Sequence, residues 1–135
     1  MFDTKIAIVL REDLATWQKL NVTAFLISGI VGAASGLVGE AYEDAAGNRY
    51  NSLLIQPVIV LGADAATIAT IYRRAMERRV ALSLYIEDMF ATGHDAANRA
   101  TVKQRHPDAM PVVGLALREE RKIVDKITKG AKMHG

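Results

Sequence analysis

The sequence predicts an α/β domain in which helices cover both faces of a largely parallel β-sheet. Short apolar runs alternate along the chain with longer segments whose apolar residues recur at helical spacing. Such alternation is typical of sheets whose parallel strands are joined by helices. The chain has 135 residues, of which 50% are hydrophobic, and this is enough to build one core. We therefore expect a single domain over residues 1–135.

Four segments are predicted to form strands, because each is a short apolar run that contains β-branched residues. They are residues 5–11 (KIAIVLR), 57–61 (PVIVL), 80–86 (VALSLYI) and 112–117 (VVGLAL). Residues 40–56, just before the second strand, are less regular. Asp44, Gly47 and Asn48 favour a turn there, within a loose hairpin.

The segments between the strands carry the helical pattern. Helices are predicted from residue 14 onward and over residues 65–79, 95–104 and 119–130. The first prediction rests on an apolar series that includes Leu14, Trp17, Leu20, Ala24 and Phe25. In the second helix, Asp64 is a suitable N-cap. The apolar face of that helix is expected to consist of Ile68, Ile71, Tyr72 and Ala75.

Residues 20–39 carry no charge, and the length of this uncharged segment matches that of a membrane span. Polar side chains and four glycines make the segment only moderately apolar, so a helix buried against the sheet explains it better. Its small residues would allow another backbone to approach closely, either within the fold or across a dimer contact. They are Gly29, Gly32, Ala33 and Gly36.

Composition excludes several kinds of site. The chain has no cysteine, so disulfides, thiolate metal sites and a cysteine nucleophile are absent, and a cytoplasmic location is favoured. The first ten residues lack the pattern of a signal peptide. No cofactor or metal is expected: no Gly-rich phosphate loop follows a strand, and His94 with Asp95 offers too few ligands for zinc.

Two basic clusters are present although the net charge is only +2. They consist of Arg73, Arg74, Arg78 and Arg79, and of Lys122, Lys126, Lys129 and Lys132. Each lies toward the end of a predicted helix, where cations interact favourably with the negative end of the helix dipole. Recognition of a nucleic acid is the alternative explanation.

Polar residues gather after the first and third predicted strands. In parallel sheets, ligands bind outside the carboxyl ends of the strands, so these two loops are the candidate site. The polar residues after the first strand are Glu12, Asp13, Thr16, Gln18 and Lys19. Those after the third strand are Glu87, Asp88, Thr92, His94, Asp95 and Asn98.

An aspartate and a lysine at this edge would suit ester hydrolysis. Asp88 could orient a water molecule, while Lys19 and the Thr92 hydroxyl could stabilise charge that develops on a carbonyl oxygen. The same residues also have simpler explanations: Asp88 could close a turn, Thr92 could cap the following helix, and Lys19 could be a solvated helix residue.

The order of three motifs resembles type 2 peptidyl-tRNA hydrolase. These are KIAIVLREDL before a helix, PVIVLGADAATIATIYRRAMERRVALSLYIED in the middle and VVGLALREERKIVDKITKG near the end. More closely, the chain resembles an uncharacterised bacterial family with that enzyme's fold. The resemblance implies a three-layer α/β/α domain with a four-stranded mixed, mostly parallel sheet. It also implies frequent dimerisation and metal-independent cleavage of the ester that joins a peptide to tRNA.

Two functions therefore stay open. In the first, the chain is an ester hydrolase in which the resemblance assigns Asp88 and Thr92, four residues apart, together with Lys19. In the second, the same fold binds a small molecule or peptide without catalysis. Its pocket would be lined by Trp17, Met89, Phe90 and His94.

Overall fold

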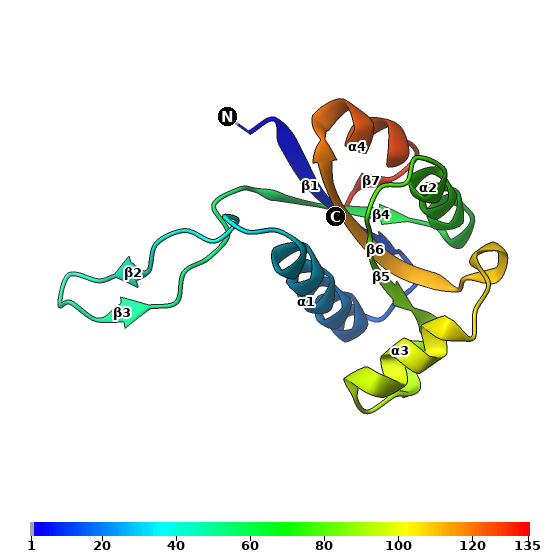
Figure 1. Cartoon of the computed structure of the whole chain (residues 1–135), viewed down its shortest axis with the longest axis horizontal. Coiled ribbons are helices and arrows are strands. Elements are labelled where there is room, and N and C mark those ends of the chain that lie inside the picture. The colour runs from blue at the N-terminus through cyan, green and yellow to red at the C-terminus, as the bar shows by residue number, and fades with distance from the viewer. Residues whose placement is uncertain (1) are drawn as a thin grey trace.

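The computed structural model describes residues 2–135, and its main sheet has five strands in the order β5-β6-β1-β4-β7 (Figure 1). The strands are β1 (Thr4–Arg11), β4 (Val58–Ala63), β5 (Ser83–Ile86), β6 (Val112–Glu120) and β7 (Lys132–Met133). The expected α/β class with a mixed sheet is confirmed. The expected number of four strands is wrong. The fifth strand, β7, has only two residues, and no apolar run in the sequence indicates it.

The expectation of a mostly parallel sheet is also wrong. Within the sheet only β1 and β4 pair in parallel, and the other three neighbouring pairs are antiparallel. The segment between β5 and β6 does not carry the chain across the sheet, so β6 returns between β5 and β1 in the opposite direction. Because β6 is antiparallel to both neighbours, β1, β4 and β5 still end at the same edge.

The central strand β1 is buried on both faces. Its residues alternate between two apolar clusters, and Ile6 and Ile8 face one while Ala7 and Val9 face the other. The first cluster includes side chains of α1 (Thr16–Ala33). The second includes side chains of α2 (Ala65–Glu77) and α4 (Arg121–Ile127). Helices therefore cover both faces of the sheet, as expected.

The cap and buried face predicted for α2 are confirmed. The Asp64 carboxylate accepts a hydrogen bond of 2.7 Å from the backbone N–H of Thr67. The buried residues of α2 are Ile68, Ile71, Tyr72 and Ala75. On the side of α2 that faces the C-terminal segment, the Arg74 guanidinium donates hydrogen bonds to the carbonyl oxygens of Ile127 and Lys129. One member of the predicted basic cluster therefore holds two segments together.

Helix α1 does not bury the apolar series that predicts it. Its buried residues are Val22, Leu26 and Ile30, which pack against the sheet. Trp17, Leu20 and Phe25, in contrast, are more than half exposed. Both sides of this helix are rich in apolar residues, so its spacing predicts a helix without showing which side faces the core.

Three further elements lie outside the layers. A 3-10 turn, η1 (Glu87–Ala91), leads to the short helix α3 (Asp95–Lys103), which has no buried residue. A second turn, η2 (Pro107–Ala109), precedes β6. The helix predicted over residues 95–104 is thus confirmed within one residue. In Figure 1, α3 lies near the end of β5 and the first turns of α1.

The predicted hairpin is present and stands away from the rest of the molecule (Figure 1). It pairs β2 (Tyr42–Glu43) with β3 (Arg49–Tyr50), and Gly47 adopts a positive φ of 86° in the turn. We refer to residues 38–55 as the arm. At its base, the Gly39 N–H donates to the Leu53 carbonyl oxygen, and Val38 and Leu54 form an isolated bridge.

None of the helices in residues 2–135 has both the length and the apolar character that a membrane crossing requires.

Candidate functional site

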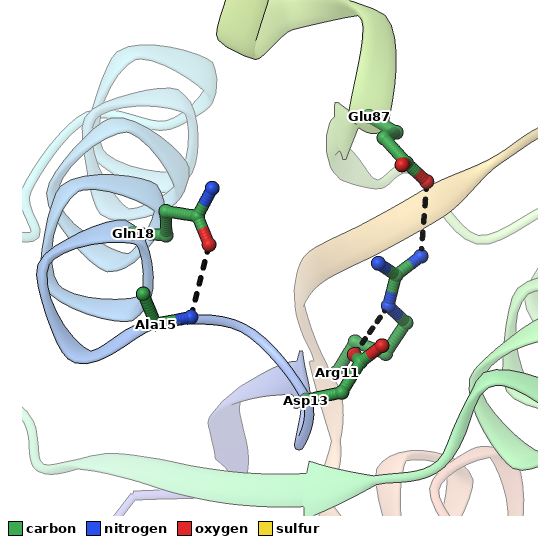
Figure 2. Close-up of polar contacts among 5 residues, drawn as sticks. All are labelled: Arg11, Asp13, Ala15, Gln18 and Glu87. Atoms are coloured by element: carbon green, nitrogen blue, oxygen red, sulfur yellow. Dashed lines mark hydrogen bonds and ion pairs between the residues drawn. The ribbon is translucent and has the colours of Figure 1, made fainter.

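The loops after β1 and β5 meet at one edge of the sheet, as the sequence predicts. Arg11, the last residue of β1, joins them: its guanidinium contacts Asp13 Oδ1 at 2.6 Å and Glu87 Oε2 at 3.2 Å (Figure 2). Close by, the Ala15 N–H donates a 2.9 Å hydrogen bond to Gln18 Oε1 and so fixes the start of α1. These contacts hold the beginning of α1 next to the beginning of η1.

Asp88 points to a partner that the sequence did not suggest. Its carboxylate accepts a 2.7 Å hydrogen bond from Arg105, which follows α3 in the chain. This hydrogen bond lowers the pKa of Asp88 below its ordinary value, so the carboxylate is ionised at neutral pH. Within the described part of the chain, no hydrogen bond or ion pair joins Asp88 to Lys19.

A cleft of about 970 Å³ opens beside this edge, between α1, β5, η1 and α3. Seven of the residues that the sequence predicts for the site line it: Trp17, Met89, Phe90, Thr92, His94, Asp95 and Asn98. Neither Lys19 nor Asp88 belongs to its lining. The four residues of the binding hypothesis thus lie along one cleft. The polar pair predicted for the hydrolase is not in it.

The apolar wall of the cleft is a chain of aromatic rings. Trp17 meets Phe90 edge to face with ring centroids 6.2 Å apart, and Phe90 lies 5.3 Å from Tyr85. The Tyr85 ring is 6.0 Å from that of Phe25 on α1. These separations are typical of favourable aromatic pairs. Two segments that are distant in sequence, α1 and the consecutive β5 and η1, thus share one apolar surface.

The polar wall comes mainly from η1 and α3. The Thr92 hydroxyl donates to the Met89 carbonyl oxygen at 2.9 Å and is also hydrogen-bonded to Asn98. His94 Nδ1 accepts a 3.2 Å hydrogen bond from the Ala97 N–H, so His94 is the N-cap of α3. This orientation fixes the neutral tautomer of His94 with its proton on Nε2.

The charged lining lies on α3. Asp95 and Arg99 form an ion pair one helical turn apart, and Lys103 follows on the same side. Lys103 forms no ion pair within residues 2–135. The unbalanced charge at this end of the cleft is therefore positive.

Sequence reasoning missed part of the lining. The sequence places Phe25 and Tyr85 only in a helix and a strand, and it indicates no role in the site for Asn21, Arg99 or Lys103. Tyr85 could have been found, since it is the aromatic residue nearest the end of β5. No local pattern in the sequence indicates that α3 lies opposite α1. Arg99 and Lys103 therefore could not be identified as cleft residues from the sequence. Among the described residues, no group of three or more His, Asp or Glu side chains is arranged to hold a metal ion.

Comparison with known proteins supports a family without an assigned activity. The model of a family described as "Protein of unknown function (DUF2000)" matches residues 4–135. A solved structure of a protein of unknown function from Agrobacterium tumefaciens strain C58 is 61% identical, with a TM-score of 0.98 and 100% of both chains covered. No curated protein matches the chain. The family match and this structural similarity establish that the chain belongs to the DUF2000 family.

Proposed function

We propose that the chain binds a small molecule in the cleft between α1 and α3, and that this molecule has a flat apolar body and a negatively charged group. The observation that carries the proposal is the cleft itself, which joins an aromatic wall to a positive end. Its volume of about 970 Å³ falls within the range of small-molecule sites, roughly 300–1,000 Å³.

The aromatic wall supports the apolar part of the proposed ligand. Trp17 is 63% exposed and Phe25 is 53% exposed, although large apolar side chains are usually buried in the core. A flat ligand that stacks against Trp17 and Phe90 would remove this surface from water. Each aromatic contact contributes on the order of 1 kcal/mol beyond the effect of area.

The position of Lys103 supports the negative group. Arg99 is neutralised by Asp95, so an anionic group entering the cleft would meet the ammonium of Lys103 and the Nε2–H of His94. The Thr92 hydroxyl and the Asn98 amide provide neutral hydrogen-bonding groups beside them. Such a small set of polar groups within an apolar pocket is typical of sites that orient one ligand.

The chain's single tryptophan makes the test direct, because Trp17 lies in the cleft wall. We expect saturable changes in Trp17 fluorescence on titration with 8-anilinonaphthalene-1-sulfonate and with small aromatic carboxylates and phosphates. Lys103→Glu should weaken binding of these anions at least about tenfold, which corresponds to about 1.4 kcal/mol.

The matched control is Lys126→Glu, which makes the same charge change on α4, across the sheet from the cleft. It should leave the affinities unchanged. Equal weakening by both variants would mean that net charge, not the cleft, attracts the probes. Absence of any saturable response in the wild-type protein would refute the proposal.

A second candidate function, ester hydrolysis on a substrate such as peptidyl-tRNA, is favoured by one observation. Thr92 lines the cleft and follows, by four residues, a carboxylate that Arg105 keeps ionised. In this proposal Asp88, adjacent in the chain to the lining residue Met89, orients the attacking water, and the Thr92 hydroxyl stabilises the developing oxyanion. Lys19 lies outside the lining and has no role in it. Purified protein should then release the peptide from peptidyl-tRNA, and Asp88→Asn should lower the rate at least about 100-fold. Release no faster than in buffer would exclude this function without affecting the binding proposal.

A further inference from the structure

Helix α1 has an outer surface that nothing in its own chain covers. Trp17, Leu20 and Phe25 are 63%, 67% and 53% exposed. The chain carries no charged residue from residue 20 to residue 39, so this surface continues without charge to the end of α1 at Ala33. Exposed patches of large apolar residues commonly mark sites of interaction.

The arm presents a second uncovered apolar surface. Tyr42 lies opposite Tyr50 in the hairpin, while Glu43 lies opposite Arg49. Since alternate residues of a strand point to opposite faces, one face of the hairpin is aromatic and the other is charged. Tyr42 and Tyr50 are nevertheless 53% and 55% exposed, and every residue from 40 to 51 is exposed.

The arm is too far from its own body to bury this face. Figure 1 shows the hairpin extending away from α1 and the sheet. A hairpin of two strands is marginally stable in water unless its apolar face packs on something else. Leu53 and Ile55, nearer the base of the arm, are also more than half exposed.

We propose that the chain forms a two-fold symmetric dimer in which the arm of each copy packs along the outer surface of the partner's α1. The two uncovered surfaces lie next to each other in the chain, because α1 ends at Ala33 and the arm begins at Val38. A two-fold axis near this junction places each arm across the other copy's helix. In such an interface each copy supplies both an arm and the α1 surface on which the partner's arm packs.

The available surface is sufficient for a stable dimer. The six large apolar side chains on these two surfaces are 44% to 67% exposed: Trp17, Leu20, Phe25, Val38, Tyr42 and Tyr50. Since a large side chain carries ~150–250 Å², their exposed parts amount to roughly 700 Å², to which the small residues of α1 add. A standard protein interface buries about 800 Å² on each partner.

Charge fits the same arrangement. From Leu20 to its end the outer surface of α1 carries no charge, so an arm approaching there with its aromatic face meets no like charge. The charged face, with Glu43 and Arg49, stays in water. Because this surface of α1 is uncharged and the arm has one apolar face, a second copy of this chain fits better than an acidic or basic partner.

The experiment measures mass in solution by light scattering and sedimentation. The wild-type protein should have about twice the 14.7 kDa mass of one chain at micromolar concentration. Leu20→Glu on α1 and Tyr42→Lys on the aromatic face of the arm should each weaken the dimer at least about tenfold. Neither residue lines the cleft, but Trp17 and Phe25 belong both to its wall and to the surface that the arm covers. Probe binding should therefore persist, or become tighter, when either variant loses the dimer. Glu43→Lys, on the charged face of the arm, is the matched control and should leave the dimer intact.

Mixing the two variants separates this arrangement from any other dimer. A mixed dimer contains one unaltered arm on an unaltered helix, and at the other site the introduced lysine faces the introduced glutamate. An equimolar mixture of Leu20→Glu and Tyr42→Lys should therefore regain the dimer mass that each variant loses alone. A monomeric wild-type protein, including one that binds lipid vesicles or another protein through the arm, would overturn the proposal. A wild-type dimer that resists both substitutions, or a mixture that stays monomeric, would overturn it too.

Discussion

Gly114, near the start of β6, sets how closely α1 approaches the sheet. A Cβ atom at this position would lie 2.6 Å from Val22 Cγ1 and 3.1 Å from Leu26 Cδ1. Both are buried side chains of α1, packed in a core that leaves them little room to move. Gly29 of α1 makes a similar approach to Ser83 of β5. At two points, therefore, the absence of a side chain allows the helix to rest against the strands.

We expect Gly114→Ala to destabilise the protein by about 1–3 kcal/mol, because the added methyl group overpacks the contact with α1. Urea denaturation monitored by circular dichroism measures the loss. Gly32→Ala is the control within α1, since a Cβ there meets nothing within 4 Å. Helix propensity should make that variant equally stable or up to about 1 kcal/mol more stable. A Gly114→Ala protein as stable as the wild type would mean that β6 and α1 are less tightly packed.

At the scale of the element, the arm owes its shape to a single carboxylate. Asp44 accepts hydrogen bonds from the backbone N–H groups of Ala46 and Asn48, both at 2.9 Å. It also accepts hydrogen bonds from the Asn48 side chain at 3.0 Å and the Tyr50 hydroxyl at 2.8 Å. An aspartate that bonds to the backbone of its own turn is a common way to close a hairpin. Here it also orients one of the two tyrosines on the aromatic face.

These hydrogen bonds predict how the arm responds to acid. The hydrogen bonds from the Asn48 side chain and then from Tyr50 lower the pKa of Asp44 to about 2. Because this value lies below that of an unfolded aspartate, the stabilisation is complete above a pH of about 4. It is lost as the pH falls from there through about 2.

The measurement is an NMR titration of the Asp44 carboxyl carbon together with the amide protons of Ala46 and Asn48. The two amides should shift with the same midpoint as the carboxyl carbon, because they bind it directly. Asp44→Asn should remove their pH dependence in this range. A midpoint near the ordinary aspartate pKa of about 3.9 would show that the carboxylate is not held by the turn.

At the scale of the whole molecule, stability is greatest at the centre of the sheet and least at its margins. Ile6, Ala7, Ile8 and Val9 of β1 are 0% exposed, and β1 lies between β6 and β4. The opposite extreme is β7, a two-residue edge strand whose residues are exposed. Local opening needs few broken contacts at β7 and many at β1.

Hydrogen exchange should therefore separate the strands. The β1 amides are expected to exchange only through global unfolding, with an opening free energy equal to that from urea denaturation. The β7 amides should exchange by local opening, at least about 100-fold faster, or ~3 kcal/mol lower. Mass spectrometry of peptides from each strand provides the comparison. Comparable exchange in β1 and β7 would contradict this gradient.

The sequence predicted those features that depend on interactions between residues close together in the chain. The apolar runs located β1, β4, β5 and β6, and Asp64 was found as a cap because a cap acts within three residues. The direction of β6 was missed, since it depends on the path of the chain between β5 and β6 rather than on either strand's residues. The same limit applies to the site, where the Asp88–Arg105 pair and the meeting of α1 with α3 join residues far apart in sequence.

The small strand β7 matters most for the order in which the protein is made. It pairs with Leu61 and Gly62 of β4, and the His134 N–H bonds to the Val60 carbonyl oxygen, so it covers an edge that would otherwise be open. While the ribosome has not yet released these residues, the unpaired edge of β4 is free to recruit strands from other nascent chains. This edge of β4 thus stays open until the chain has been made through Met133, well after β4 itself. Lys132, placed on the new margin, discourages further strands from joining.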